Sequence, residues 1–161
     1  MTPQILTRFL WLLALSISGF AHADATPLKA VQVAERVWFV QGQAALGTPE
    51  NRNFISNAGF VVTDEGVVVV DALGSPALAQ ELLAEIKRVT PQPVRYVIVT
   101  HYHADHIYGL QTFKAAGATV LAHAKGREYL NSETARQRLE ASRVELAPWI
   151  SASTHLLEAD R

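Results

Sequence analysis

The chain has 161 residues, a formal net charge of −1 and no cysteine. The nearly balanced charge argues against a nucleic-acid partner, because proteins that bind nucleic acids carry a basic patch. Without cysteine the chain forms no disulfides, and any metal must be held by histidine and carboxylate side chains. The length suits one domain of ordinary size.

The N-terminus has the pattern of a secretory signal peptide. Arg8 precedes an apolar run at 9–20, and Ala21-His22-Ala23 has the small-x-small pattern of a signal-peptidase site. The run is too short for a membrane anchor, since about 20 apolar residues are needed to span a bilayer. We expect a signal peptide at 1–23, a domain at 24–161, and a periplasmic or secreted protein with no stable membrane anchor after cleavage. Removal of Arg8 changes the formal charge from −1 to −2.

The first part of the domain shows strand patterns. The apolar runs 28–33 and 37–41 are separated by Glu35-Arg36, which predicts a hairpin. Segments 54–63 and 67–71 flank a turn at 64–66, where Gly66 can take a positive φ. The run 67–70 has no polar alternation and predicts a strand covered on both faces. Segment 42–53 is rich in Gly, Pro and Asn and predicts a mobile loop.

The period changes at residue 75. Ser75 followed by Pro76 predicts a helix start, and apolar residues share one helical face until Pro91. We then expect a buried strand at 94–100, a short helix at 108–116, a strand at 118–122 and a mostly helical segment at 125–146 with a break near 131–132. The tail 148–161 has no clear period. Strands that alternate with helices predict an α/β fold, with the sheet covered by helices.

Four potential metal ligands lie directly after the predicted strand 94–100: His101, His103, Asp105 and His106. The carboxyl end of a strand is where open α/β sheets place their ligands. His101 and His103 are two residues apart and can reach one metal, while Asp105 and His106 lie where the chain turns into a helix, point elsewhere and can bind a second. A structural zinc site or a surface histidine patch is the other interpretation, although structural sites commonly use cysteine.

The stretch T-H-Y-H-A-D-H-I-Y-G at 100–109 resembles the His-x-His-x-Asp-His signature of the metallo-β-lactamase superfamily, and G-V-V-V-V-D-A at 66–72 is similar to an earlier family motif. The resemblance covers about 31–130. It implies an α/β (α+β) fold, a four-layer αβ/βα sandwich with metals between two sheets. It also implies that His101 and His103 bind the first zinc and that Asp105 and His106 bind the second, with Asp105 also catalytic. Asp71 is implied as a supporting residue near the metals, although an ordinary polar strand-end residue is an equal interpretation.

The resemblance implies a zinc-dependent hydrolase that holds two zinc ions and acts on a small molecule with a carbonyl-type group. A β-lactam, a thioester and a sulfur compound all stay open as substrates. Segments 37–40 and 123–130 look most like the zinc metallohydrolases associated with quinoprotein and sulfur-oxidation systems. A non-catalytic metal-binding or redox-accessory module is the alternative function.

The family pattern needs more ligands than these four, namely a histidine, an aspartate and a further histidine from later motifs. We therefore expect this chain to be the N-terminal part, or first half, of the sandwich, and 24–161 alone to bind zinc weakly and not to catalyse. His123 is expected to be a polar cap and His155 a surface histidine. Trp38, Phe39 and the loop 42–53 either border a substrate pocket or belong to the hairpin.

Overall fold

The structure is a computed structural model of the chain, and it describes residues 27–161. The expected signal peptide at 1–23 lies outside the described residues. Within 27–161, no helix combines the length and the apolar character that crossing a bilayer requires.

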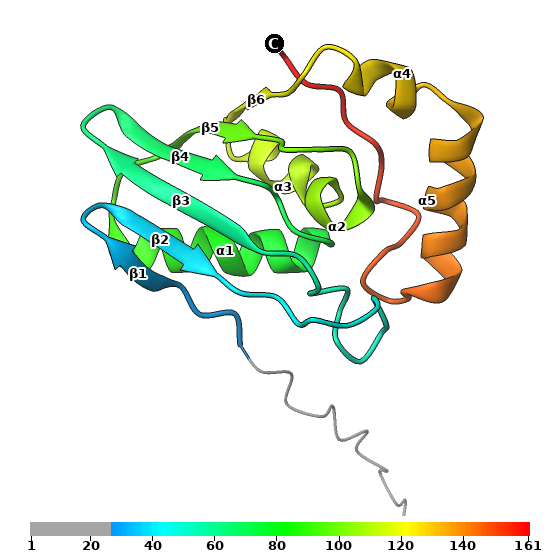
Figure 1. The fold of residues 1–161 in the computed structure, drawn as a ribbon, viewed down its shortest axis with the longest axis horizontal. Helices are drawn as coiled ribbons and strands as arrows, with labels where there is room; N and C mark the ends of the chain where they lie inside the picture. The colour runs from blue at the N-terminus through cyan, green and yellow to red at the C-terminus, as the bar shows by residue number, and fades with distance from the viewer. Residues whose placement is uncertain (1–26) are drawn as a thin grey trace, which may run out of the picture.

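A six-stranded mixed sheet forms the centre of the fold (Figure 1). Its strands are adjacent in chain order: β1 (Val31–Ala34), β2 (Val37–Val40), β3 (Ala58–Thr63), β4 (Gly66–Val70), β5 (Val94–Ile98) and β6 (Thr119–Leu121). The pairs from β1 to β4 are antiparallel, whereas β5 is parallel to both β4 and β6. The carboxyl ends of β4, β5 and β6 therefore meet at one edge of the sheet.

Both predicted hairpins are present, with shorter strands than the apolar runs suggested. The strand β1 begins at Val31 instead of residue 28, and β3 begins at Ala58 instead of residue 54. Gly66 has a φ of 138°, in the region that glycine adopts without strain. The strand β5 ends at Ile98, so the chain is already irregular before it reaches the histidines.

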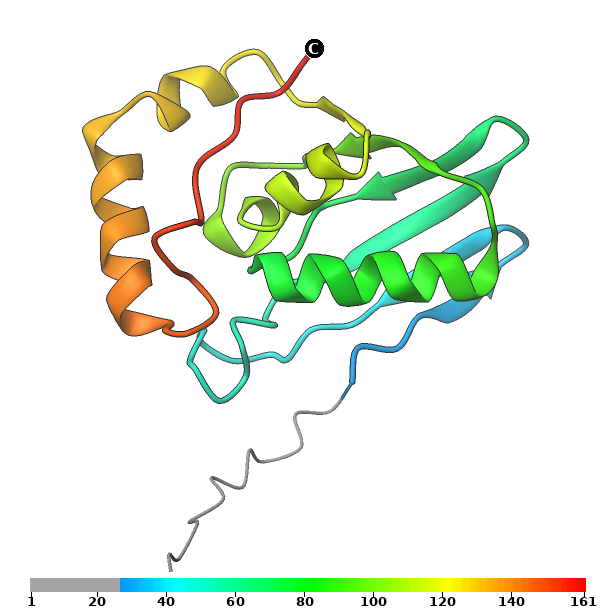
Figure 2. The ribbon, with the colours of Figure 1, turned by 180° about the vertical axis from the view of Figure 1, so that it is seen from behind.

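Two helices cover one face of the sheet, as Figure 2 shows: α1 (Pro76–Val89) and α3 (Leu110–Ala115). The predicted start of α1 is confirmed, since the Ser75 hydroxyl accepts a 3.3 Å hydrogen bond from the Leu78 N–H. The short helix α2 (Ala104–Ile107) precedes α3 and contains half of the histidine motif. The predicted break in the last helical segment separates α4 (Gly126–Leu130) from α5 (Glu133–Glu145).

The two faces of the sheet differ in burial. The aligned residues Phe60, Val69, Val97 and Val120 are at most 1% exposed and form the layer that packs on the helices. On the opposite face, Tyr96 and Ile98 are 41% and 39% exposed. The prediction of a buried strand is therefore wrong for the outer face of 94–100, whereas in 67–70 the alternate residues Val68 and Val70 are half-buried. Within 27–161, helices pack on one face of these strands only, so the alternate side chains stay open.

Candidate metal centre

The sequence-predicted ligands gather at the edge where β4 and β5 end. Asp71 directly follows β4, and His101 and His103 lie in the loop after β5. Asp105 and His106 lie in α2. The backbone N–H of Asp71 still donates to the Ile98 carbonyl at 2.9 Å, which ties the end of β4 to the end of β5. The parallel pairing thus brings Asp71 to the motif that begins at Thr100.

Asp71 is buried and accepts three hydrogen bonds. It is 5% exposed and has a φ of 63°, which is uncommon for a residue with a side chain. Its carboxylate accepts from the Thr100 N–H at 2.9 Å and from the Thr100 hydroxyl at 2.7 Å. The third bond joins it to His106 Nδ1 at 2.8 Å. Because an ionised carboxylate only accepts, Nδ1 of His106 carries the proton, and its Nε2 keeps a free lone pair when the ring is neutral.

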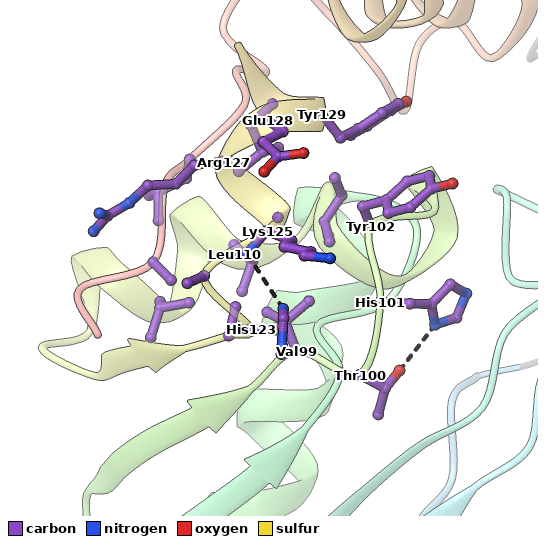
Figure 3. Close-up of a pocket in the computed structure, with 18 of the residues that line it drawn as sticks. Val99, Thr100, His101, Tyr102, Leu110, His123, Lys125, Arg127, Glu128 and Tyr129 are labelled. Atoms are coloured by element: carbon purple, nitrogen blue, oxygen red, sulfur yellow. Dashed lines mark hydrogen bonds between the residues drawn. The ribbon is translucent and has the colours of Figure 1, made fainter. Parts of the chain in front are cut away.

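The carboxylate of Asp71 also determines the tautomer of His101, through the hydroxyl of Thr100. The hydroxyl of Thr100 gives its one proton to Asp71, so its oxygen accepts from Nδ1–H of His101 at 3.0 Å (Figure 3). Nε2 of His101 is then also unprotonated. Such carboxylate contacts are the usual way in which proteins orient metal-ligating histidines. Asp71 therefore sets the tautomer of two of the three histidines in the motif.

The four predicted ligands lie close together but do not yet converge on one point. The ring centroid of His101 is 4.6 Å from that of His103 and 4.1 Å from that of His106. Nε2 of His106 is 3.4 Å from an Asp105 carboxylate oxygen. Among residues 27–161, no group of three or more His, Cys, Asp or Glu side chains is arranged to hold a metal ion. Histidine and carboxylate side chains are suitable zinc ligands, and the tautomers of His101 and His106 leave Nε2 free to bind a metal. The arrangement of these side chains, however, does not form a complete set of zinc ligands.

The expected separation into two pairs differs from this arrangement. We expected Asp105 and His106 to point away from His101 and His103. The structure places the His106 ring at least as near to His101 as the His103 ring is. The helical turn of α2 carries His106 back toward the strand end, where Asp71 holds it. The spacing of the motif residues along the sequence could not predict the contact between His106 and Asp71.

Burial, hydrogen bonds and neighbouring charges shift the pKa values of Asp71, His101 and His106, and the shifts do not all have the same direction. Burial works to raise the pKa of Asp71, but hydrogen bonds from His106 and Thr100 hold it below its ordinary value. Burial likewise opposes protonation of His106, while the bond and the charge of Asp71 and the charge of Asp105 raise the His106 pKa. The pKa of His101 is lowered, first by burial and then by the charges of His106 and His103.

Backbone contacts hold α2 against the strand ends. The Ser56 hydroxyl donates to the carbonyl of Asp105, and the Ala72 N–H donates to the carbonyl of His106 at 2.9 Å. Gly109 lies so close to Ala72 that an added Cβ would be 2.0 Å from the Ala72 oxygen. The roles of Ser56, Thr100 and Gly109 were not predicted from the sequence. Only Thr100 carried a signal, its place directly before the first histidine.

The remaining histidines of 27–161, His123 and His155, make hydrogen bonds to residues outside the motif. His123 accepts the Lys125 N–H at 3.2 Å through Nδ1, between the end of β6 and the start of α4 (Figure 3). His155 is exposed, and its own N–H donates to the Gln111 side chain at 3.0 Å. His155 is thus a surface histidine, as expected, while the cap role of His123 stays a prediction.

The hairpin aromatic and the loop 42–53 are anchored to other elements. Trp38 stacks on Phe60 with ring centroids 5.3 Å apart, as a hairpin residue. The loop is irregular, but Trp149 Nε1–H donates to the Pro49 carbonyl at 2.7 Å and the Asn53 amide donates to Gly74 at 2.9 Å. These bonds fix the loop beside α1 and the chain that follows α5.

Comparison with known proteins assigns this fold and motif to a family. The family model described as the metallo-β-lactamase superfamily matches residues 51–156, which is more than half of the chain. The chain therefore belongs to the metallo-β-lactamase superfamily. This superfamily consists of metal-dependent hydrolases that typically bind zinc.

Curated relatives act on different substrates. Metallo-beta-lactamase type 2 from Bacillus cereus is 33% identical over 86 residues, which are 53% of this chain and 32% of the relative. Linear primary-alkylsulfatase from Pseudomonas sp. (strain ATCC 19151) is 35% identical over 54 residues, 34% of this chain and 10% of the relative. An exodeoxyribonuclease also matches. The chain thus spans a third or less of the length of these two relatives, and the family leaves the substrate open.

Solved structures agree on the fold. The metallo-β-lactamase from Erythrobacter litoralis is 25% identical, with a TM-score of 0.53 over 64% of this chain and 44% of that one. The metallo-β-lactamase FIM-1 from Pseudomonas aeruginosa, solved in a mono-zinc form, has a TM-score of 0.55 at 19% identity and covers 67% of this chain and 47% of that one. The predicted α/β class and the family likeness are confirmed.

Proposed function

We propose that residues 100–106 form part of the zinc site of a hydrolase that acts on a small molecule with a carbonyl-type group. The observation that carries this proposal is the bonding of Asp71. One buried carboxylate accepts the Nδ1–H of His106 directly and, through the hydroxyl of Thr100, also keeps the proton of His101 on Nδ1, so that Nε2 of each neutral ring is available to a metal. A surface histidine patch has no need of such an arrangement.

The proposed ligand roles are those that the family resemblance implies. His101 and His103 would hold the first zinc, and Asp105 and His106 the second. Bound zinc supplies hydroxide near neutral pH and polarises a substrate oxygen. Asp105, with a carboxylate oxygen 3.4 Å from Nε2 of His106, would be the catalytic carboxylate, and Asp71 would keep the His106 ring in place. Because the donors in 27–161 leave the ligand set open, we expect turnover only from a protein that adds the later family ligands.

Substrate, partners and location belong to the same proposal. A β-lactam or a thioester suits hydrolysis of a carbonyl-type group, and the alkylsulfatase relative adds a sulfate ester to the substrates worth testing.

We propose no nucleic-acid partner, because the formal charge is −1. A periplasmic or secreted protein without a stable membrane anchor remains our proposal from the N-terminal pattern.

The test combines zinc binding with turnover. Zinc content is measured for the purified protein, and its rates are measured with a carbapenem, an acyl-glutathione thioester and a linear alkyl sulfate. The double variant His101→Ala/His103→Ala is compared with His155→Ala, a control that removes an exposed histidine outside the motif. We expect the double variant to lose zinc and the control to retain it. Equal zinc content in both proteins would contradict the proposed site.

The alternative, a non-catalytic metal-binding or redox-accessory module, is separated by the same experiment. A protein that carries the later ligands, binds zinc through His101 and His103 and turns over none of the three substrates would favour the binding module. Turnover that disappears with the double variant would favour the hydrolase.

A further inference from the structure

A cavity of about 620 Å³ lies beside the histidine motif, between the ends of β5 and β6, helix α4 and the C-terminal segment 156–161 (Figure 3). Its volume falls within the range of small-molecule sites. The interior walls are mainly aliphatic and include Val99, Ile107, Leu110, Val120, Leu130 and Leu157.

The aliphatic walls of the cavity contribute no side-chain polar atom. Among the described residues, the buried side-chain polar atom that lacks a hydrogen bond is Gln92 Oε1, and Gln92 does not line the cavity. A ligand that carried polar groups into the interior would lose their hydrogen bonds to water without replacement. The deep part of the cavity therefore suits an apolar group.

One border of the cavity carries polar and aromatic groups. His101 of the motif lines it, and Tyr102 stacks on Tyr129 with ring centroids 4.2 Å apart. Lys125 and Glu128 of the α4 region also line the cavity (Figure 3). A molecule whose apolar part fills the interior can thus place its polar end at His101, which is the candidate metal ligand that lines the cavity.

We propose that this cavity binds the unbranched aliphatic chain of the substrate, with the hydrolysable polar group at the His101 border. The proposal rests on the proposed function for the identity of the reacting end, but the binding of the chain does not depend on the metal. The expected substrates are amphiphiles with a long acyl or alkyl chain.

The test measures chain binding without zinc. Hexanoate, octanoate and decanoate are titrated calorimetrically into the protein in the presence of a chelator. Burial of each added CH₂ in an apolar site should tighten binding about fourfold, which corresponds to ~0.8 kcal/mol. Decanoate should shift the methyl NMR signals of Val99, Leu110 and Val120. An affinity independent of chain length would overturn the proposal.

Two neighbouring leucines give a matched pair of variants. Leu157 and Leu156 are both partly buried against the core, and only Leu157 lines the cavity. We expect Leu157→Ser to weaken decanoate binding at least about tenfold and Leu156→Ser to change it less than about twofold. If Leu157→Ser fails to fold, the methyl shifts of the unchanged protein decide.

The position of the bound chain can also contradict the proposal. Decanoate shifts confined to Val31 and Val33, which are exposed at the other end of the sheet, would place the ligand elsewhere and overturn it. Another part of the protein could fill the cavity in place of a ligand. NOEs between the cavity methyl groups and residues that do not line the cavity, together with no decanoate binding, would therefore also overturn the proposal. Decanoate binding in a protein that takes up no zinc would refute the proposed function and leave the cavity assignment standing.

Discussion

The carboxylate of Asp71 lies 2.8 Å from Nδ1 of His106, although the two residues are 35 positions apart in the sequence. This contact joins the end of β4 to helix α2 and fixes which ring nitrogen of His106 faces the rest of the motif. The hydroxyl of Thr100 extends the effect of this carboxylate to His101.

Asp71→Asn should weaken the preference of His106 for the tautomer that carries its proton on Nδ1. The amide keeps the shape of the side chain but removes the charge and one acceptor oxygen, so the proton of His106 is no longer held on Nδ1. We expect both neutral tautomers in long-range ¹H–¹⁵N NMR spectra and zinc affinity lower by roughly 10- to 100-fold. Asp64→Asn is the control, because Asp64 is an exposed aspartate paired with Arg36 at 2.7 Å. An unchanged His106 tautomer in Asp71→Asn would contradict the assignment.

Thr100→Val should affect His101 more than His106. Valine keeps the branched shape and the backbone N–H bond to Asp71, but it removes the hydroxyl that connects Asp71 with His101. We expect the Nδ1–H preference of His101 to disappear, that of His106 to persist, and stability to fall by about 1 kcal/mol. The spectra that report ring tautomers measure this, with Thr119→Val as a strand control. Equal effects on both rings would argue against a relay through Thr100.

Gly109→Ala should destabilise the whole domain. Its new Cβ would lie 2.0 Å from the Ala72 carbonyl oxygen and 2.7 Å from Ala79 Cβ, so α2 and α3 must move away from the end of β4. Overpacking of this kind costs about 1–3 kcal/mol, measurable by urea unfolding. At Gly126, an added Cβ meets nothing within 4 Å, so Gly126→Ala should change stability by less than about 0.5 kcal/mol. Equal stability of the two variants would show that the close approach is absent in solution.

Acid should release Asp160 from the edge of β6. The bond from Lys114 and the bond from the Val120 N–H lower the pKa of Asp160 below its ordinary 3.8. Because the folded-state pKa is depressed, the contribution of Asp160 is complete well above pH 3.8 and is lost as the pH falls through the lower folded-state value. The Val120 amide signal, whose N–H donates to Asp160 at 2.8 Å, should titrate with a midpoint below 3.8. A midpoint at or above 3.8, or the same titration in Asp160→Asn, would contradict this contact.

The local features of the fold could be read from the sequence because they depend on neighbours along the chain. Ser75 caps α1, Gly66 takes a positive φ, and Ser132 begins α5 after the predicted break. Each of these depends on contacts within a few residues, such as the bond from Leu78 N–H to Ser75. Strand ends were less accurate, because pairing with a neighbouring strand decides where a strand stops.

The sequence by itself determined the α/β order, the family motif and the identity of His101, His103, Asp105 and His106 as candidate ligands, since their types and spacing lie within one short segment. Only the tertiary structure decided that Asp71 holds His106 directly and His101 through Thr100, and that one sheet face stays open within 27–161. Both depend on parallel pairing of β4 with β5 and on where helices pack. These are contacts between distant segments, which become adjacent only when the chain folds.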